Sequence, residues 1–346
     1  MVEVKKHGIF MEKTDASFEN KAVLNPTCFQ DGETVHFFYR AIDTNNVSSI
    51  GYAKLKGPLE IIERKREPVI FPEFDYEKMG CEDPRITKIG EIYYLTYTAY
   101  DGVNARIAYA TSKDLISWEK QGIISANVSY RDAETYFENS ELKDRYYFFS
   151  SYMQEKMGKD VLLWEKDAIL FPDKIAGKYA LIHRVLPDMQ IIFFEDFAEL
   201  ASIDFWKEHL SNLAQHVLVE NTEWFETRNI GAGAPPIKTE AGWLLIYHAV
   251  EELNKGRIYS VGAILVDLDD PKKLVGKLSE PLFAPSEAWE HADGRMDVVF
   301  PSGTAIFNNR LYIYYGAADE RIGVASVEMD DFLRDLVCCK KDCSRG

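Results

Sequence analysis

A short charged turn, Gly80-Cys-Glu-Asp-Pro-Arg85, holds the residues of this chain that are best suited to chemistry. Pro84 fixes its own φ and biases Asp83 toward an extended conformation, so the local chain largely determines the direction of that carboxylate. In an extended segment Asp83 and Arg85 share a face, because they are two residues apart. A carboxylate beside a guanidinium is either a structural ion pair or a pair that binds a sugar and exchanges protons with it.

The turn leads into a type of strand that recurs along the chain. Each copy is an aromatic or aliphatic run that follows a turn containing Gly or Asn and ends in a polar residue. The copies are residues 34–43, 92–101, 177–184, 242–251 and 310–319. A second strand follows most of them. Five copies of one hairpin predict an all-β fold, a five-bladed β-propeller in a single domain, whereas a two-sheet sandwich would not require the repetition.

The predicted propeller covers residues 20–327, with an N-terminal extension at 1–19 and a C-terminal tail at 328–346. Residues 130–164, rich in aromatic and charged side chains, are predicted to be an insertion that caps the active site or forms an oligomer contact. One clear helical pattern covers residues 202–217.

Composition limits the partners and the compartment. The 346 residues are 46% hydrophobic, which is ample for a core, and they contain no apolar run long enough for a membrane span and no signal-peptide pattern. Five scattered cysteines argue against a disulfide framework and predict a reducing cytoplasm. A net charge of −16 disfavours nucleic acid and anionic membrane as partners. The spacing of His, Cys and carboxylates predicts no metal site.

In a propeller the inner strands line the central axis, so polar residues at their ends converge on one funnel. The strand ends supply Arg40, Asp101, His183, Arg184, His248 and Asp319. The loops before the hairpins add Asn25, Glu82, Asp83, Arg85, Lys166, Asp167 and Arg228. This mixture predicts a polar pocket that can hold an anion. Simpler interpretations are a turn for Asn25, a surface charge for Arg40 and satisfied core histidines for His183 and His248.

Several motifs, in this order, resemble glycoside hydrolase family 130. They are Gly80-Cys-Glu-Asp-Pro-Arg85, Tyr97-Thr-Ala-Tyr-Asp-Gly102, Lys166-Asp-Ala-Ile-Leu-Phe-Pro172, Lys178-Tyr-Ala-Leu-Ile-His-Arg184, Ile230-Gly-Ala-Gly-Ala-Pro-Pro-Ile237 and Tyr314-Tyr-Gly-Ala-Ala-Asp319. The resemblance spans nearly the whole chain. It implies a five-bladed propeller and an activity that is a β-mannoside phosphorylase in most members and a β-mannosidase in a minority.

The resemblance also implies roles for individual residues. Asp83 would be the catalytic acid, acting through the 3-hydroxyl of mannose, with Arg85 steering its carboxylate. The substrate-binding residues would be Asn25, Arg40, Glu82, Arg85, Tyr100, Asp101 and Asp319. The phosphate-binding residues would be Lys166, His183, Arg184, Arg228 and His248. Phosphate would be a co-substrate, the product would be α-mannose 1-phosphate with inverted configuration, and no cofactor or metal is implied.

The chain departs from the family pattern near the expected phosphate site. Lys166 stands where an arginine is expected, and Arg228 or Asn229 where a lysine is usual. Glu226 could supply a carboxylate of the kind found in hydrolysing members. We therefore predict an inverting β-mannoside phosphorylase, with an inverting β-mannosidase and a non-catalytic carbohydrate-binding propeller as alternatives. Linkage stays open between β-1,4 and β-1,2, and a homo-oligomer is possible.

Overall fold

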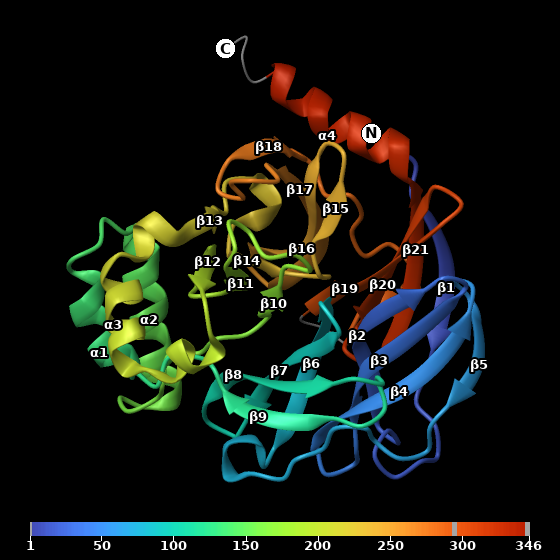
Figure 1. The fold of residues 1–346 in the computed structure, drawn as a ribbon, viewed down its shortest axis with the longest axis horizontal. Helices are drawn as coiled ribbons and strands as arrows, with labels where there is room; N and C mark the ends of the chain where they lie inside the picture. The colour runs from blue at the N-terminus through green and yellow to red at the C-terminus, as the bar shows by residue number, and fades with distance from the viewer. Residues whose placement is uncertain (1, 293–295, 343–346) are drawn as a thin grey trace.

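The computed structural model describes residues 2–292 and 296–342, and most of its regular structure is β-strand (Figure 1). The mainly β character that the sequence predicts is confirmed. Within these residues the strands form sheets of eight, four and nine strands. The helices are α1 (Tyr130–Phe137), α2 (Asp144–Met157), α3 (Ile203–Ser211) and α4 (Met329–Asp342). No helix in the described part is both long and apolar enough to cross a membrane.

The eight-stranded sheet consists of two antiparallel groups that meet through one parallel pairing, Ser48 with Gly80. Its strands are β2 (Ala22–Asp31), β3 (Thr34–Ile42), β4 (Ser48–Lys56), β5 (Glu60–Arg64), β6 (Gly80–Ile89), β7 (Ile92–Tyr100), β8 (Ala105–Ser112) and β9 (Glu119–Ile123). The four-stranded sheet is antiparallel. It contains β10 (Ile169–Leu170), β11 (Tyr179–His183), β12 (Met189–Phe194) and β13 (Val217–Val219).

The nine-stranded sheet also joins two antiparallel groups, through a parallel pairing of β17 with β19. Its strands are β1 (Lys5–Met11), β14 (Asn229–Ala232), β15 (Ile237–Thr239), β16 (Gly242–Leu253), β17 (Gly256–Val266), β18 (Leu274–Lys277), β19 (Met296–Phe307), β20 (Arg310–Ala317) and β21 (Arg321–Glu328). Asn308 and Asn309 both have positive φ, which is the type I′ geometry that connects tight hairpins such as β19–β20.

Both predicted ends of the chain are tied to the sheets. Residues 1–19 supply β1, which pairs with β21, so this stretch belongs to the last strand group and is not a separate extension. The predicted tail, 328–346, contains α4, where Phe332 and Leu336 are fully buried in the core. Cys343 lies outside the described residues.

The predicted insertion and the predicted helix form one helical region beside β12 and β13 (Figure 1). Residues 130–164 contain α1 and α2, and residues 202–217 contain α3 followed by a short 3₁₀ turn, as predicted. Phe137 of α1, Tyr146 of α2 and Trp206 of α3 share one buried cluster. The helices are therefore anchored by their own core, which continues into the neighbouring strands.

A buried glutamate hydrogen-bonded to a ring on a following strand occurs five times in the described residues. The pairs are Glu19–Tyr39 (2.7 Å), Glu77–Tyr97 (2.8 Å), Glu165–His183 (2.9 Å), Glu226–Tyr247 (2.6 Å) and Glu290–Tyr315 (2.7 Å). No glutamate of this set is more than 1% exposed. In the four tyrosine pairs a cation completes the contact: Arg64, Lys120, Lys277 and Lys6. Burial of a carboxylate without partners costs free energy, so the loop that carries each glutamate is held against the strand that carries its ring.

Replacing Tyr247 by Phe tests this fastening. The substitution leaves the buried Glu226 carboxylate short of one donor, so the free energy of unfolding should fall by about 1–3 kcal/mol in urea denaturation. Tyr109→Phe is the matched control, since Tyr109 is partly buried and its ring stacks on Phe197. Equal stability of the Tyr247 variant and the wild type would contradict the assignment.

Candidate active site

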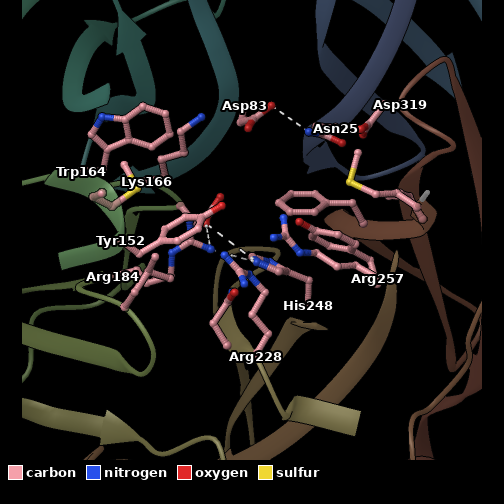
Figure 2. Close-up of a pocket in the computed structure, with 18 of the residues that line it drawn as sticks. Asn25, Asp83, Tyr152, Trp164, Lys166, Arg184, Arg228, His248, Arg257 and Asp319 are labelled. Carbon is pink, nitrogen blue, oxygen red and sulfur yellow. Dashed lines mark hydrogen bonds and ion pairs between the residues drawn. The ribbon is translucent and has the colours of Figure 1, made fainter. Parts of the chain in front are cut away.

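A cavity of about 410 Å³ collects eight of the predicted site residues. They are Asn25, Arg40, Asp83, Lys166, Arg184, Arg228, His248 and Asp319. Figure 2 shows Asn25, Asp83 and Asp319 along one side of the cavity, and the cationic or imidazole side chains of Arg184, Arg228, His248 and Arg257 along the other. The two sets come from segments far apart in sequence, so the fold brings them together.

Asp83 reaches the cavity from a β-bulge and not from an extended strand. The pairing of β6 with β7 shifts register between Glu82 and Arg85, and Asp83 has a φ of 51°. The expectation of an extended Asp83 that shares a face with Arg85 is therefore wrong. The bulge takes Asp83 and Pro84 out of the ladder and re-aims the carboxylate. Asn25, which also precedes a proline, lies at a similar register shift with a φ of 45°.

The Asp83 carboxylate lies in a positive field although it is almost fully buried. Its Oδ1 accepts a hydrogen bond from Asn25 Nδ2 at 2.8 Å and lies 3.4 Å from Arg40 Nη1. Burial raises its pKa, but Arg40, Lys166 and Arg85 and the Asn25 donor outweigh this effect and bring the pKa below its usual value. Asp83 is thus ionised at neutral pH.

Glu82 and Arg85 support this arrangement from outside the cavity wall. Glu82 bridges two cations of the cavity, Arg40 at 2.7 Å and Lys166 at 3.3 Å. Arg85 donates to the main-chain oxygens of Asp83 and Pro84 at 3.0 Å and to that of Gly233. It therefore holds the backbone of the bulge, and the predicted direct contact with the Asp83 carboxylate is absent from the described hydrogen bonds.

The opposite side of the cavity is built around Arg184. Its Nη1 lies 2.8 Å from Asp167 Oδ2 and 3.1 Å from His248 Nε2, and His248 stacks on Phe300. Burial, with Arg184 and Arg85 nearby, holds the pKa of His248 well below its usual value. His248 is accordingly neutral, and its Nε2 accepts from the guanidinium. Burial raises the pKa of Asp319 across the cavity, Asp83 raises it further, and Arg40 and Lys166 oppose that rise.

Besides Glu82 and Arg85, three more predicted site residues do not line the cavity. The Tyr100 hydroxyl donates to the Gly102 carbonyl, and both Asp101 carboxylate oxygens accept from the turn at residues 103 and 104. His183 is fully buried, with Nδ1 on Glu165 and Nε2 3.0 Å from His209. It faces away because adjacent residues of an extended segment point to opposite sides, and its neighbour Arg184 takes the cavity side.

Glu226 is also absent from the cavity wall. Its carboxylate accepts from Tyr247, from the main chain of residues 222 and 223, and from Lys277. It is the buried member of a structural pair, so the expectation that it supplies a carboxylate to the site, as in hydrolysing members, is wrong for this geometry.

Several cavity residues carry little or no signal in the sequence. Tyr152 comes from α2 and Trp164 from the segment after it, and only the aromatic character of the insertion pointed to them. Arg257 lies on β17 just after a hairpin turn, with no sequence signal that separates it from a surface charge. Asp167 was expected in the pocket but without a role. Asn229, considered as an alternative to Arg228, lines the cavity together with it.

A cavity with a buried carboxylate on one side and guanidiniums on the other offers acceptors and donors to a polar ligand and charge to an anion. Residues 5–337 match glycoside hydrolase family 130, described as beta-1,4-mannooligosaccharide phosphorylase, and the chain belongs to this family.

Named relatives cover nearly the full length. A 1,2-beta-oligomannan phosphorylase of a Thermoanaerobacter species is 35% identical over 344 residues, 96% of this chain and 99% of the relative. A beta-1,2-mannobiose phosphorylase of the same species is 34% identical and covers 90% and 92%. Among solved structures, the beta-1,2-mannobiose phosphorylase of Listeria innocua has a TM-score of 0.70 at 22% identity and covers 96% of this chain and 99% of its own.

The buried histidines predict how stability depends on pH. Burial, then His183 and His216, holds the pKa of His209 well below 6.5, so His209 is neutral in the fold but protonated in the unfolded chain below its ordinary pKa. The unfolded state then binds more protons, and the free energy of unfolding should fall as pH drops from about 7 to about 5. His209→Asn should show a shallower slope over this range, and an unchanged slope would contradict the account.

Proposed function

We propose that the protein cleaves β-mannosides with inorganic phosphate, releasing α-mannose 1-phosphate and a shortened sugar. The observation that carries this proposal is the placement of Asp83 across the cavity from Arg184, Arg228 and His248 (Figure 2). An inverting displacement needs its acid and its nucleophile on opposite faces of the sugar ring. The named relatives, which are β-mannoside phosphorylases, support the same reaction.

In this proposal the sugar to be transferred binds beside Asp83, held by Asn25, Arg40 and Asp319. Phosphate binds opposite, where the Arg184 guanidinium can offer two parallel hydrogen bonds. Lys166 and Arg228 also line the cavity, but each is paired with a glutamate, Glu82 or Glu252, and so adds less charge. Phosphate is already a nucleophile, so only one protein carboxyl must move a proton. Asp83 supplies it to the leaving oxygen by way of the mannose 3-hydroxyl.

Binding of phosphate also helps Asp83 to take up its proton. Lys166 is among the cations that lower the Asp83 pKa. A phosphate anion beside Lys166 offsets that positive charge and makes protonation of Asp83 easier. Asp83 therefore takes up its proton more readily when the co-substrate is bound.

A second candidate is an inverting β-mannosidase, favoured by one observation. Asp167 is a second carboxylate in the cavity on the side opposite Asp83, and it could activate a water there. Its Oδ2 is held at 2.8 Å by Arg184, and its Oδ1 lies 3.7 Å from Arg85. Both carboxylate oxygens of Asp167 are thus already engaged by guanidiniums, and this arrangement favours the phosphorylase.

We infer that the five antiparallel strand groups are the blades of a five-bladed propeller. Support comes from the five glutamate–ring pairs, each of which joins a loop to the second strand of one antiparallel group. The group formed by β19, β20, β21 and β1 would close the ring with the N-terminal strand. We further propose that the enzyme is cytoplasmic, since Cys28 and Cys81 are free thiols. We also propose that it uses phosphate as a co-substrate and needs no cofactor. A homo-oligomer stays a prediction.

The reverse reaction tests the function and the linkage together. The protein is incubated with α-mannose 1-phosphate and a panel of sugar acceptors, and inorganic phosphate is measured. We expect release with mannose or a β-1,2-mannobiose as acceptor, because the relatives carry that linkage in their names. Free mannose from β-mannobioses in phosphate-free buffer would instead establish the hydrolase. Binding of these sugars without either reaction would leave a carbohydrate-binding propeller.

Asp83→Asn tests the acid. The amide keeps the shape and loses the transferable proton, so kcat should fall by at least about 100-fold. Calorimetry should find the affinity for disaccharide nearly unchanged. Glu226→Gln is the control, with lower stability and wild-type turnover, because its carboxylate lies outside the cavity. Turnover that survives in the Asp83 variant would refute the assignment.

A further inference from the structure

A second pocket of about 630 Å³ lies next to the active-site cavity, and we call it the outer pocket. Its lining residues are Asp144, Arg145, Phe148, Tyr152, Thr227, Arg228, Glu252 and Arg257. Tyr152, Arg228 and Arg257 also line the active-site cavity, so these three side chains form a wall that the two pockets share. A ligand that extends out of the cavity past this wall enters the outer pocket.

Phe148 presents an unusual surface in the outer pocket. It is 58% exposed, the most exposed of the large hydrophobic side chains in the described residues. Phe148 and Tyr152 lie one turn apart on α2, and their rings stack at 6.3 Å with an angle of 21°. An exposed aromatic surface beside a polar cavity is typical of a ligand-binding site. The C–H faces of a sugar ring can pack flat on such a surface.

The charges of the outer pocket suit a neutral ligand with many hydroxyls. Arg228 and Arg257 both form ion pairs with Glu252. Arg145 donates to the main-chain oxygen of Arg228 at 3.0 Å. Guanidiniums that share a carboxylate attract a free anion only weakly, yet they and Glu252 still offer donors and acceptors to hydroxyl groups. This balance favours a sugar chain over inorganic phosphate.

We propose that the outer pocket binds the mannosyl units of longer substrates beyond the disaccharide, with Phe148 as the stacking surface. The proposal rests on the β-mannoside phosphorolysis above and adds a preference for chain length. Tyr152 then links the two sites, because one side of it meets the cavity and its ring continues the Phe148 surface. The region of α2, which the sequence marks as an insertion, supplies the specificity.

Phe148→Ala tests the proposal by a comparison of chain lengths. The variant and the wild type are assayed for phosphorolysis of a β-linked mannobiose and of the matching mannotetraose. For the disaccharide kcat/KM should stay unchanged, because Phe148 lies outside the active-site cavity. For the tetrasaccharide KM should rise with kcat preserved, so that kcat/KM falls about tenfold, which is about 1.4 kcal/mol. Phe71→Ala is the control, since Phe71 is 47% exposed and lines neither pocket.

Three results would overturn the inference. If kcat/KM falls equally for both substrates, or falls for neither, Phe148 does not determine the preference for chain length. A rise in the KM for phosphate in Phe148→Ala or Arg145→Gln, without a chain-length effect, would make the outer pocket a phosphate route. If the wild type cleaves neither substrate with phosphate, the proposed function itself fails, and this outcome is distinct because it appears before any variant is compared.

Discussion

The buried glutamate–ring pair is the interaction on which the rest of the structure depends. Each pair ties the loop before a strand group to the second strand of that group, in a setting where water cannot compete. A carboxylate removed from water is strongly destabilising unless donors surround it, so the ring and, in the four tyrosine pairs, the cation must be in place. A shift of the strand that carries the ring would leave the glutamate without its donor. Each pair therefore favours the correct strand register as well as stabilising the fold.

The same pairs position the active site, because the residue after the paired ring faces the other way. Arg40 follows Tyr39, Arg184 follows His183 and His248 follows Tyr247, and all three line the cavity. After Tyr315 comes Gly316, where a Cβ atom would lie only 2.2 Å from Asn25 Oδ1. In three of the five strands a structural ring on one side is thus followed by a cavity-lining side chain on the other, and in a fourth the glycine leaves room for Asn25.

Much of the site could be predicted from the sequence, for physical reasons that differ between residues. Polar side chains that interrupt apolar strands, such as Arg184 and His248, stand out wherever a strand runs toward a polar centre. His183 stood out equally, but both faces of its strand are buried, so periodicity cannot tell which side meets the ligand. The bulge at Asp83 was hidden because proline rules describe isolated chain segments and not the ladder around them. Local sequence patterns do not predict long-range packing. They therefore could not show that β1 pairs with β21 or that α2 packs over the cavity.

The account makes phosphate the nucleophile that faces Asp83 across the sugar. The most direct measurement is phosphorus-31 NMR of the protein with β-1,2-mannobiose and inorganic phosphate. We predict the growth of a signal from α-mannose 1-phosphate as inorganic phosphate declines in equal amount. Free mannose formed at a rate that does not depend on phosphate, with no new phosphorus signal, would contradict the account.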